Sequence, residues 1–322
     1  MMPHGVGVGV DEWMVVREDV AAALVTGAPV VALESTVIAH GLPRPHNLDT
    51  ALEMEAAVRE AGAMPATIGI LDGKIVVGLN AEQIARIADS GDVAKVSSSD
   101  ISAVLATRRL GATTVAGTVY VAERAGIRIM ATGGIGGAHR GSENTFDISA
   151  DLTELARTAV AVVCAGAKVI LDLPRTMEVL ETLGIPVVGY GTNEFPAFYS
   201  RESGLELQHR VDAVDEAARL LCIHWDLGWL GQGTSAGLLI VNPPPAESAI
   251  ARNEVEAMVA EALVSAEAAG IRGKGVTPFL LEHLGKKSGG KTLKTNIALL
   301  IANARLAAGI AVAYSARKAG RW

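Results

Sequence analysis

The stretch that decides the fold is MATGGIGGAHRGSENTFDISADLTELARTAVAVVCAGAKVILDL, residues 130–173. A β-rich run enters a loop that carries five glycines between Gly133 and Gly141. So many glycines indicate backbone that bends sharply or closely approaches a ligand. Ser149 is a suitable N-cap for a helix over residues 152–157. An unbroken apolar run over 159–167 then predicts a buried core segment with Lys168 at its end.

Lys168 has two interpretations. A desolvated lysine loses preference for its charged form, so its amine can become a nucleophile toward a carbonyl carbon and form a Schiff base. Alternatively, Lys168 extends to water from the end of a strand or pairs with Asp172. The local pattern leaves both interpretations open.

Working outward, a second buried run over 29–33 ends in Glu34. A carboxylate at the end of a buried strand lies where parallel sheets carry chemistry; pairing with a lysine or capping a helix is an equal alternative for Glu34. Lys95, on a short strand before Ser97, Ser98, Ser99 and Asp100, is a candidate for binding an anion at the next helix N-terminus.

Alternating helices and strands predict an α/β fold. Asp72-Gly73 predicts a hairpin between strands 66–71 and 74–78, so the sheet should be mixed. Asn47 and Asn80 are candidate helix N-caps. We expect a tail and short helix over 1–28 and one domain over 29–322, with a flexible connection at 231–237. The other predicted strands are 93–97, 113–117, 127–132, 187–190 and 238–241, and the predicted helices are 17–25, 47–61, 80–90, 101–110, 119–125, 152–157, 176–183, 212–227, 246–270, 277–284 and 292–318.

Composition narrows the function classes. The chain has 322 residues, is 50% hydrophobic and has a formal charge of −7, and its basic residues are dispersed, so a nucleic-acid partner is not expected. We found no signal-peptide pattern and no apolar run of the roughly 18 residues that span a bilayer. Only two cysteines, Cys164 and Cys222, are present. A cytoplasmic protein without membrane contact or disulfide framework is therefore expected.

Three other features of the sequence are candidates for functional sites. Residues 285–292, GKKSGGKT, match the nucleotide phosphate-loop pattern, but the preceding segment has helical spacing and Gly285 reads as its C-cap, so nucleotide binding is not expected there. Cys164 lies four residues before Lys168 but lacks a flanking base. His40, His46 and His139 are alternative metal ligands, although their spacing matches no zinc signature.

Three stretches together carry a family resemblance. They are ALEST at 32–36, ATGGIGGAHRG…TFDISADL at 131–152 and VCAGAKVILD at 163–172. The shorter motifs HGLP, PATIG, TTVAGT, NPPP, TPFLL and LKTNI also match in order. The chain resembles the pseudouridine-5′-phosphate glycosidases, also called the indigoidine synthase A family.

This resemblance implies a three-layer α/β/α sandwich with a mixed, largely parallel central sheet, and a homotrimer. It implies Lys168 as the nucleophile, Glu34 as the proton donor and Asp147 as the ligand of Mn²⁺ or another divalent ion such as Mg²⁺. The implied substrate-binding residues are Lys95, Val115, Thr132, His139, Ser149, Ala150, Asp151 and Asn296. The chain departs from the family at Ser98 and Ser99, where basic residues are common.

The implied reaction is reversible cleavage of pseudouridine 5′-phosphate to uracil and ribose 5-phosphate. The glycosidic bond is C–C, so the paired carboxylates of ordinary glycosidases do not suffice, whereas an imine between Lys168 and an opened ribose offers another route for the electrons. Two alternatives remain: a Schiff-base aldolase or lyase acting on another sugar phosphate, and a catalytically silent oligomer that binds a phosphorylated nucleoside.

Overall fold

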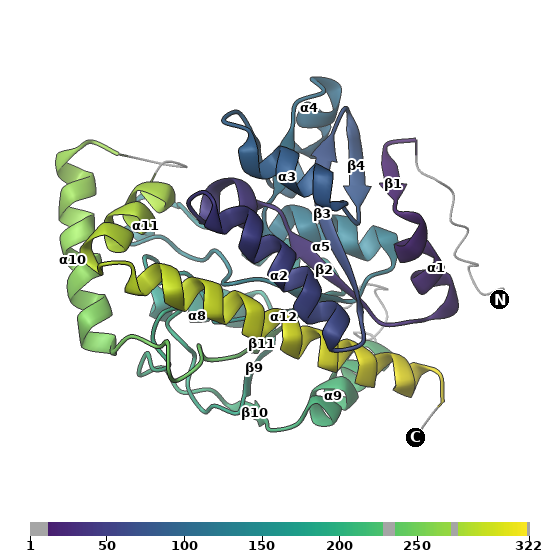
Figure 1. Ribbon diagram of the computed structural model, residues 1–322. Coiled ribbons are helices and arrows are strands. Elements are labelled where there is room, and N and C mark those ends of the chain that lie inside the picture. Colours follow the sequence, from purple (N-terminus) through teal and green to yellow (C-terminus); the bar gives the residue numbers. More distant parts are fainter. Residues whose placement is uncertain (1–11, 228–235, 272–275, 321–322) are drawn as a thin grey trace.

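The computed structural model describes residues 12–227, 236–271 and 276–320. The predicted connection at 231–237 lies almost wholly outside these ranges, as does the glycine-rich part of the predicted tail. A mixed, mostly parallel sheet runs through the molecule with helices on both sides (Figure 1). The predicted three-layer α/β/α fold is confirmed.

Eleven strands are present in the described residues, and they form one sheet in the order β1-β4-β3-β2-β7-β8-β11-β9-β10, with β6 on β3 and β5 on β6. Their bounds are β1 Met14–Val16, β2 Val30–Glu34, β3 Met64–Leu71, β4 Lys74–Val77, β5 Ala94–Val96, β6 Gly111–Thr113, β7 Ile129–Ala131, β8 Ala161–Cys164, β9 Val187–Tyr190, β10 His209–Val211 and β11 Leu238–Val241. The core strands β2, β7, β8 and β11 are apolar along nearly their whole length and fully buried, as expected for parallel strands covered on both faces.

The pairings within the sheet are parallel except at β3, which runs antiparallel to β4 and β6. The turn Asp72-Gly73 joins the antiparallel strands β3 and β4, so the predicted hairpin is confirmed. In the parallel core, Leu33 of β2 lies opposite Ala131 of β7, which in turn lies opposite Val163 of β8. These three strands therefore end at the same edge of the sheet.

Two groups of helices sandwich the sheet. α2, α9 and α12 pack together on one face, with α12 crossing β2, β7 and β8 (Figure 1). α5 packs against β2 and against α7. The helix bounds are α1 Glu18–Thr26, η1 Val37–Gly41, α2 His46–Glu60, α3 Ala81–Asp89, η2 Ser98–Asp100, α4 Ile101–Ala106, α5 Val115–Ala125, α6 Ser142–Thr145, α7 Ala150–Leu155, α8 Leu173–Thr182, α9 Val214–Asp226, α10 Arg252–Ala268, α11 Val276–Lys287 and α12 Lys291–Lys318.

α12 is long and apolar enough to cross a membrane, with a mean hydropathy of 1.8 over 18 residues. The expectation that no segment reaches this length and hydropathy was therefore wrong. Half of this window is buried inside the fold. The helix also carries the buried Asn303, whose amide donates to the Thr132 carbonyl at 2.8 Å and accepts from Asn242 at 3.0 Å. The apolar surface of α12 thus serves packing on the sheet.

Several local predictions need correction. The strand expected at 113–117 ends at Thr113, because Thr114 caps α5 by accepting from the Gly117 amide at 3.3 Å. Asn47 does not cap α2, because the helix already begins at His46, and the Asn47 amide donates to the carbonyls of Ile38 and Ala88. Gly285 lies inside α11, and α12 begins soon afterwards, so the phosphate-loop match joins two helices, in agreement with its rejection.

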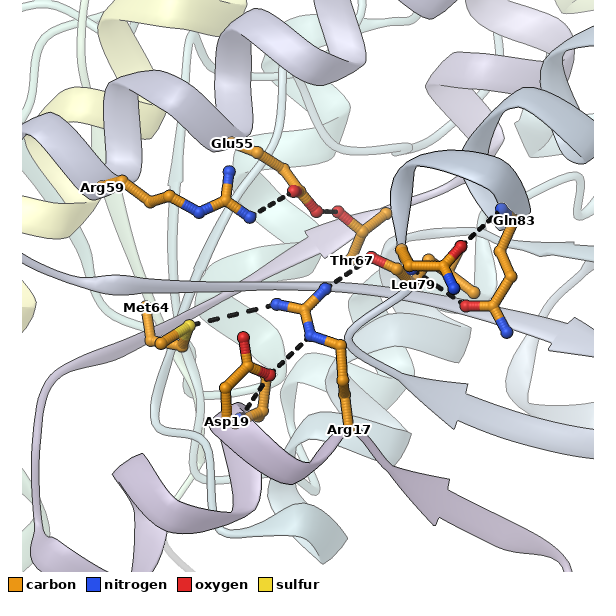
Figure 2. Close-up of polar contacts among 10 residues, drawn as sticks. Arg17, Asp19, Glu55, Arg59, Met64, Thr67, Leu79 and Gln83 are labelled. Carbon is orange, nitrogen blue, oxygen red and sulfur yellow. Dashed lines mark hydrogen bonds and ion pairs between the residues drawn. The ribbon is translucent and has the colours of Figure 1, made fainter.

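The N-terminal segment is part of the sheet, which the sequence analysis did not predict. β1 pairs with β4, and Arg17 donates to the Leu79 carbonyl at 2.7 Å and pairs with Asp19. Figure 2 shows this cluster beside a second one, in which Glu55 lies between Arg59 and Thr67. The hydrogen bonds of the two clusters hold the N-terminal segment and α2 against the region around β3.

Candidate active site

Polar residues from several strand ends converge on two adjoining cavities. Glu34 is the last residue of β2, Thr132 directly follows β7, and Lys168 follows β8 by four residues. Both cavities are lined by Glu34, Thr36, Lys95 and Lys168. The cavities therefore form one site at the carboxyl edge of the parallel core, where open α/β sheets bind ligands.

The two cavities differ in chemistry. The first, which we call the apolar cavity, is additionally lined by Val37, His40, Gly41, Thr132, Gly133, Gly134, Phe198, Asn296 and Leu300. The second, the polar cavity, is additionally lined by Ser97, Asp100, Thr114, Gly136, His139, Ser149, Ala150, Asp151 and Leu171.

Glu34 is almost fully buried, with 5% of its surface exposed. Burial is the largest influence on its carboxyl and raises the pKa, while Lys168 and a hydrogen bond from the Thr132 hydroxyl oppose this rise. The net shift is upward, so Glu34 holds its proton to a higher pH than an ordinary glutamate. A carboxyl in this state can act as a general acid.

Lys168 does not lie on a strand, because β8 ends at Cys164. It occupies a turn whose backbone is fixed by a bond from the Lys168 amide to the Ile135 carbonyl at 3.0 Å. Asp172, the partner proposed in the structural interpretation, caps α8 by accepting from the Arg175 amide at 3.0 Å. Lys168 is partly buried and faces both cavities, as the nucleophile interpretation requires.

Cys164 offers no competing nucleophile. Its side chain is fully buried, and burial raises the pKa of the thiol to about 12. The reactive form of cysteine is the thiolate, which is scarce at neutral pH under these conditions.

Asp151 organises the glycine loop. One of its carboxylate oxygens accepts from the Ala116 amide and the other from the Gly136 amide, both at 2.8 Å. A Cβ atom at Gly136 would lie 2.2 Å from the Ser149 hydroxyl, and one at Gly137 would lie 2.4 Å from the Thr176 hydroxyl. These two glycines are therefore required by close packing of the loop on protein atoms.

His139 and Asp147 lie near each other. Burial and the charges of Lys95 and Lys168 lower the pKa of His139, and Asp147 opposes them. Asp147 is exposed, and no described residue donates a hydrogen bond to its carboxylate. The described residues include no group of three or more His, Cys, Asp or Glu placed to hold a metal. A lone carboxylate of this kind fits a water-rich Mg²⁺ or Mn²⁺ better than zinc.

Most predicted site residues line the cavities, and two do not. Asp147 lies outside both linings, and the side chain of Val115 is buried in the hydrophobic core, so a substrate contact there must come from its backbone. Arg140 lies on a separate cavity with Ser200 and Arg252, and Glu143 pairs with Arg175.

Several lining residues were not predicted from the sequence. Thr36 is adjacent to Glu34 in sequence, which is a usable signal. Phe198 and Leu300 reach the site from a loop after β9 and from α12, and no local pattern marks them. His40 was noted only as a possible metal ligand.

The fold and the site define an α/β enzyme that combines a buried acid with a lysine amine in a cleft. The chain matches the family described as indigoidine synthase A like protein over residues 19–313. It is 54% identical over 295 residues to a pseudouridine-5′-phosphate glycosidase of Caldanaerobacter subterraneus subsp. tengcongensis, covering 92% of this chain and 94% of the relative. A relative of the same name from Myxococcus xanthus is 53% identical, covering 92% and 97%.

Solved structures agree with these relatives. The prealnumycin C-glycosynthase in complex with ribulose 5-phosphate is 43% identical with a TM-score of 0.88, covering 97% of this chain and 100% of that one. An indigoidine synthase A-like protein of Thermotoga maritima is 37% identical with a TM-score of 0.84, covering 94% and 97%. The chain belongs to the indigoidine synthase A family.

Proposed function

We propose that the protein is a pseudouridine-5′-phosphate glycosidase, which reversibly splits the substrate into uracil and ribose 5-phosphate. The observation that carries this proposal is the shared lining of both cavities by Glu34, Lys95 and Lys168 in a chain 54% identical to an enzyme of that name. The C-glycosynthase relative was solved with a sugar phosphate bound, which supports a site for C-glycosidic chemistry on such a sugar.

In the proposed mechanism, the Lys168 amine forms a bond to C1′ of the ribose. Glu34 gives its proton to the ring oxygen as the C1′–O4′ bond breaks, and the sugar opens. The C1′–C5 bond then breaks with its electron pair moving to the base, which takes up a proton, and an iminium links C1′ to Lys168. Water hydrolyses the iminium and releases ribose 5-phosphate.

The remaining side chains of the polar cavity bind and orient the sugar phosphate. Besides Lys168, the basic side chains that line it are Lys95 and His139. The glycine loop contributes fewer phosphate donors than its sequence suggests, because the amides of Ile135, Gly136 and Ala138 already donate to protein acceptors. Ser149 and Ala150 lie at the start of α7, whose N-terminal dipole also favours an anion.

The experiment that tests this function is trapping with borohydride. After incubation with ribose 5-phosphate and borohydride, peptide mapping should find a reduced pentose-phosphate adduct on Lys168, and the variant Lys168→Ala should carry none. Turnover of pseudouridine 5′-phosphate then separates the glycosidase from an aldolase or lyase. A folded protein that forms no adduct at Lys168 would instead be a silent binder.

We also propose that Asp147 holds Mn²⁺ or Mg²⁺, with water as the other ligands. A bound ion would supply positive charge that offsets negative charge on the reacting substrate. Chelator treatment should lower kcat/KM by roughly tenfold or more, with recovery on adding Mn²⁺. The variant Asp147→Asn should need more Mn²⁺ for half-maximal activity. Unchanged activity in the metal-stripped protein, checked by elemental analysis, would contradict the metal site.

Assembly and location follow from the family resemblance. We propose a homotrimer that acts in the cytoplasm. Light scattering should give three times the chain mass, and a monomer or dimer would contradict the trimer.

A further inference from the structure

His40 lies on the apolar cavity and has no part in the mechanism above. It belongs to η1, a π-helix that begins three residues after Glu34. π-Helical turns are rare and are often found at functional sites. The conformation places the His40 ring at the same cavity as Asn296, which reaches it from α12.

The environment of His40 favours its neutral imidazole. Burial and the charge of Lys95 lower the pKa of the ring, so the imidazole is neutral at pH 7. The Val93 backbone beside the ring raises the pKa and only partly offsets this lowering.

The other nitrogen, Nε2, is buried and has no hydrogen-bond partner among the described residues. A neutral imidazole has one donor and one acceptor nitrogen. With the ring proton on Nδ1, the unpartnered Nε2 is the acceptor. A buried polar atom without a partner is uncommon and costs free energy, so it marks a place where a ligand donor fits.

The lining of the apolar cavity indicates which ligand donor this is. Val37, Phe198 and Leu300 supply apolar surface, while His40 and Asn296 supply polar groups from two different elements. A uracil ring has apolar faces and an edge of two N–H groups and two carbonyls. The Asn296 amide can pair with one N–H and its neighbouring carbonyl, which leaves the second N–H for an acceptor.

We propose that His40 Nε2 accepts a hydrogen bond from a ring N–H of the uracil base and thereby helps to select C-linked nucleotides. This inference rests on the proposed glycosidase function. A base linked through C5 keeps both ring N–H groups, whereas a base linked through N1 keeps only one. A site that provides acceptors for two N–H groups therefore favours the C-linked isomer.

The test uses two variants of His40. His40→Phe keeps an aromatic ring of similar size and removes the acceptor, and His40→Gln restores an acceptor oxygen. In the synthesis direction, His40→Phe should raise the KM for uracil by roughly 10- to 100-fold, while His40→Gln should recover part of the loss. The KM for ribose 5-phosphate and its trapping on Lys168 should be unchanged, which a general structural defect would not allow.

A second measurement identifies which ring nitrogen of the base contacts His40. Wild type should prefer pseudouridine 5′-phosphate to its N1-methyl or N3-methyl derivative, and this preference should collapse in His40→Phe for the derivative methylated at the contacted nitrogen. If both preferences are unchanged in His40→Phe, or if the KM for uracil does not rise, the proposed contact is wrong. If wild type neither turns over nor forms the lysine adduct, the proposed function itself has failed.

Discussion

Glu34 and Glu55 are two buried glutamates in different environments. Glu34 ends β2, whereas Glu55 lies on α2 against the neighbouring strand β3. Their exposed fractions are 5% and 4%, and each accepts a hydrogen bond from a threonine hydroxyl. Glu55 also accepts from Arg59 at 2.8 Å, so both of its oxygens are engaged (Figure 2). For Glu34, no described residue donates to the second oxygen, which is left to the cavity side.

The difference follows from position in the fold. Glu55 lies in the middle of α2 and faces Thr67 of β3, where a neighbouring helix turn provides Arg59 at i+4. Glu34 is the last residue of a parallel strand, where the chain leaves the sheet and opens a cavity lined by lysines. Burial with full hydrogen bonding makes a structural carboxylate, whereas burial with an unengaged oxygen makes one poised to transfer a proton.

The largest expected effect separates the two carboxylates by activity. Glu34→Gln should lower kcat/KM for pseudouridine 5′-phosphate by roughly 10²- to 10⁴-fold, because the amide keeps the Thr132 hydrogen bond but has no proton to give. Steady-state kinetics measures this loss. The matched control is Glu55→Gln, which should stay within about threefold of wild type because it touches no substrate. Equal losses in the two variants would remove the distinction.

The next largest expected effect is on stability, and it falls on the Glu55 variant rather than on the Glu34 variant. Glu55→Gln should lower the free energy of unfolding by about 1–3 kcal/mol, because it leaves Arg59 without its ion pair and weakens the bond from Thr67. Urea denaturation at pH 7 measures this change. Glu34→Gln should not destabilise the protein under the same conditions. A destabilisation of Glu34→Gln as large as that of Glu55→Gln would show that both carboxylates are structural.

The sequence patterns predicted the α/β class and the mixed sheet well, because those signals are local, whereas the three layers were implied by the family resemblance. The fully apolar runs, the Asp72-Gly73 turn and the cap at Asn80 lie within the elements they specify, and all were confirmed. β1 was missed because three residues give too little periodicity. The strand expected over 113–117 was misplaced because Thr114, a β-branched residue, acts as a helix cap.

Sequence patterns could predict the site residues that directly follow a strand. They could not predict the residues that reach the site only through tertiary packing. Glu34 at a strand end was singled out by pattern, whereas the nucleophile role of Lys168 needed the family resemblance to favour it over a structural one. Phe198 and Leu300 reach the apolar cavity from distant parts of the chain. His40 was visible in the sequence, but its unpartnered nitrogen exists only in the folded protein.

The smallest effect concerns how stability depends on pH. The pKa of Glu34 is raised above its ordinary value of 4.5, so the folded protein holds a proton that the unfolded chain has released. Stability therefore falls as pH rises from the ordinary pKa through the raised one, and Glu34→Gln removes this contribution. The free energy of unfolding of Glu34→Gln, relative to wild type, should increase with pH across this window and level off above it.

Urea denaturation of both proteins from pH 5 to pH 9 tests this expectation, because the other titrating groups are common to both and cancel in the difference. Glu55→Gln provides the comparison, since a glutamine at that position removes the partner of Arg59 and should show no gain toward high pH. A constant difference between wild type and Glu34→Gln over the whole range would mean that Glu34 ionises as readily in the fold as in water. A carboxyl of that kind would be no better a proton donor at neutral pH than an exposed one, and the acid role of Glu34 would then need another cause for its proton.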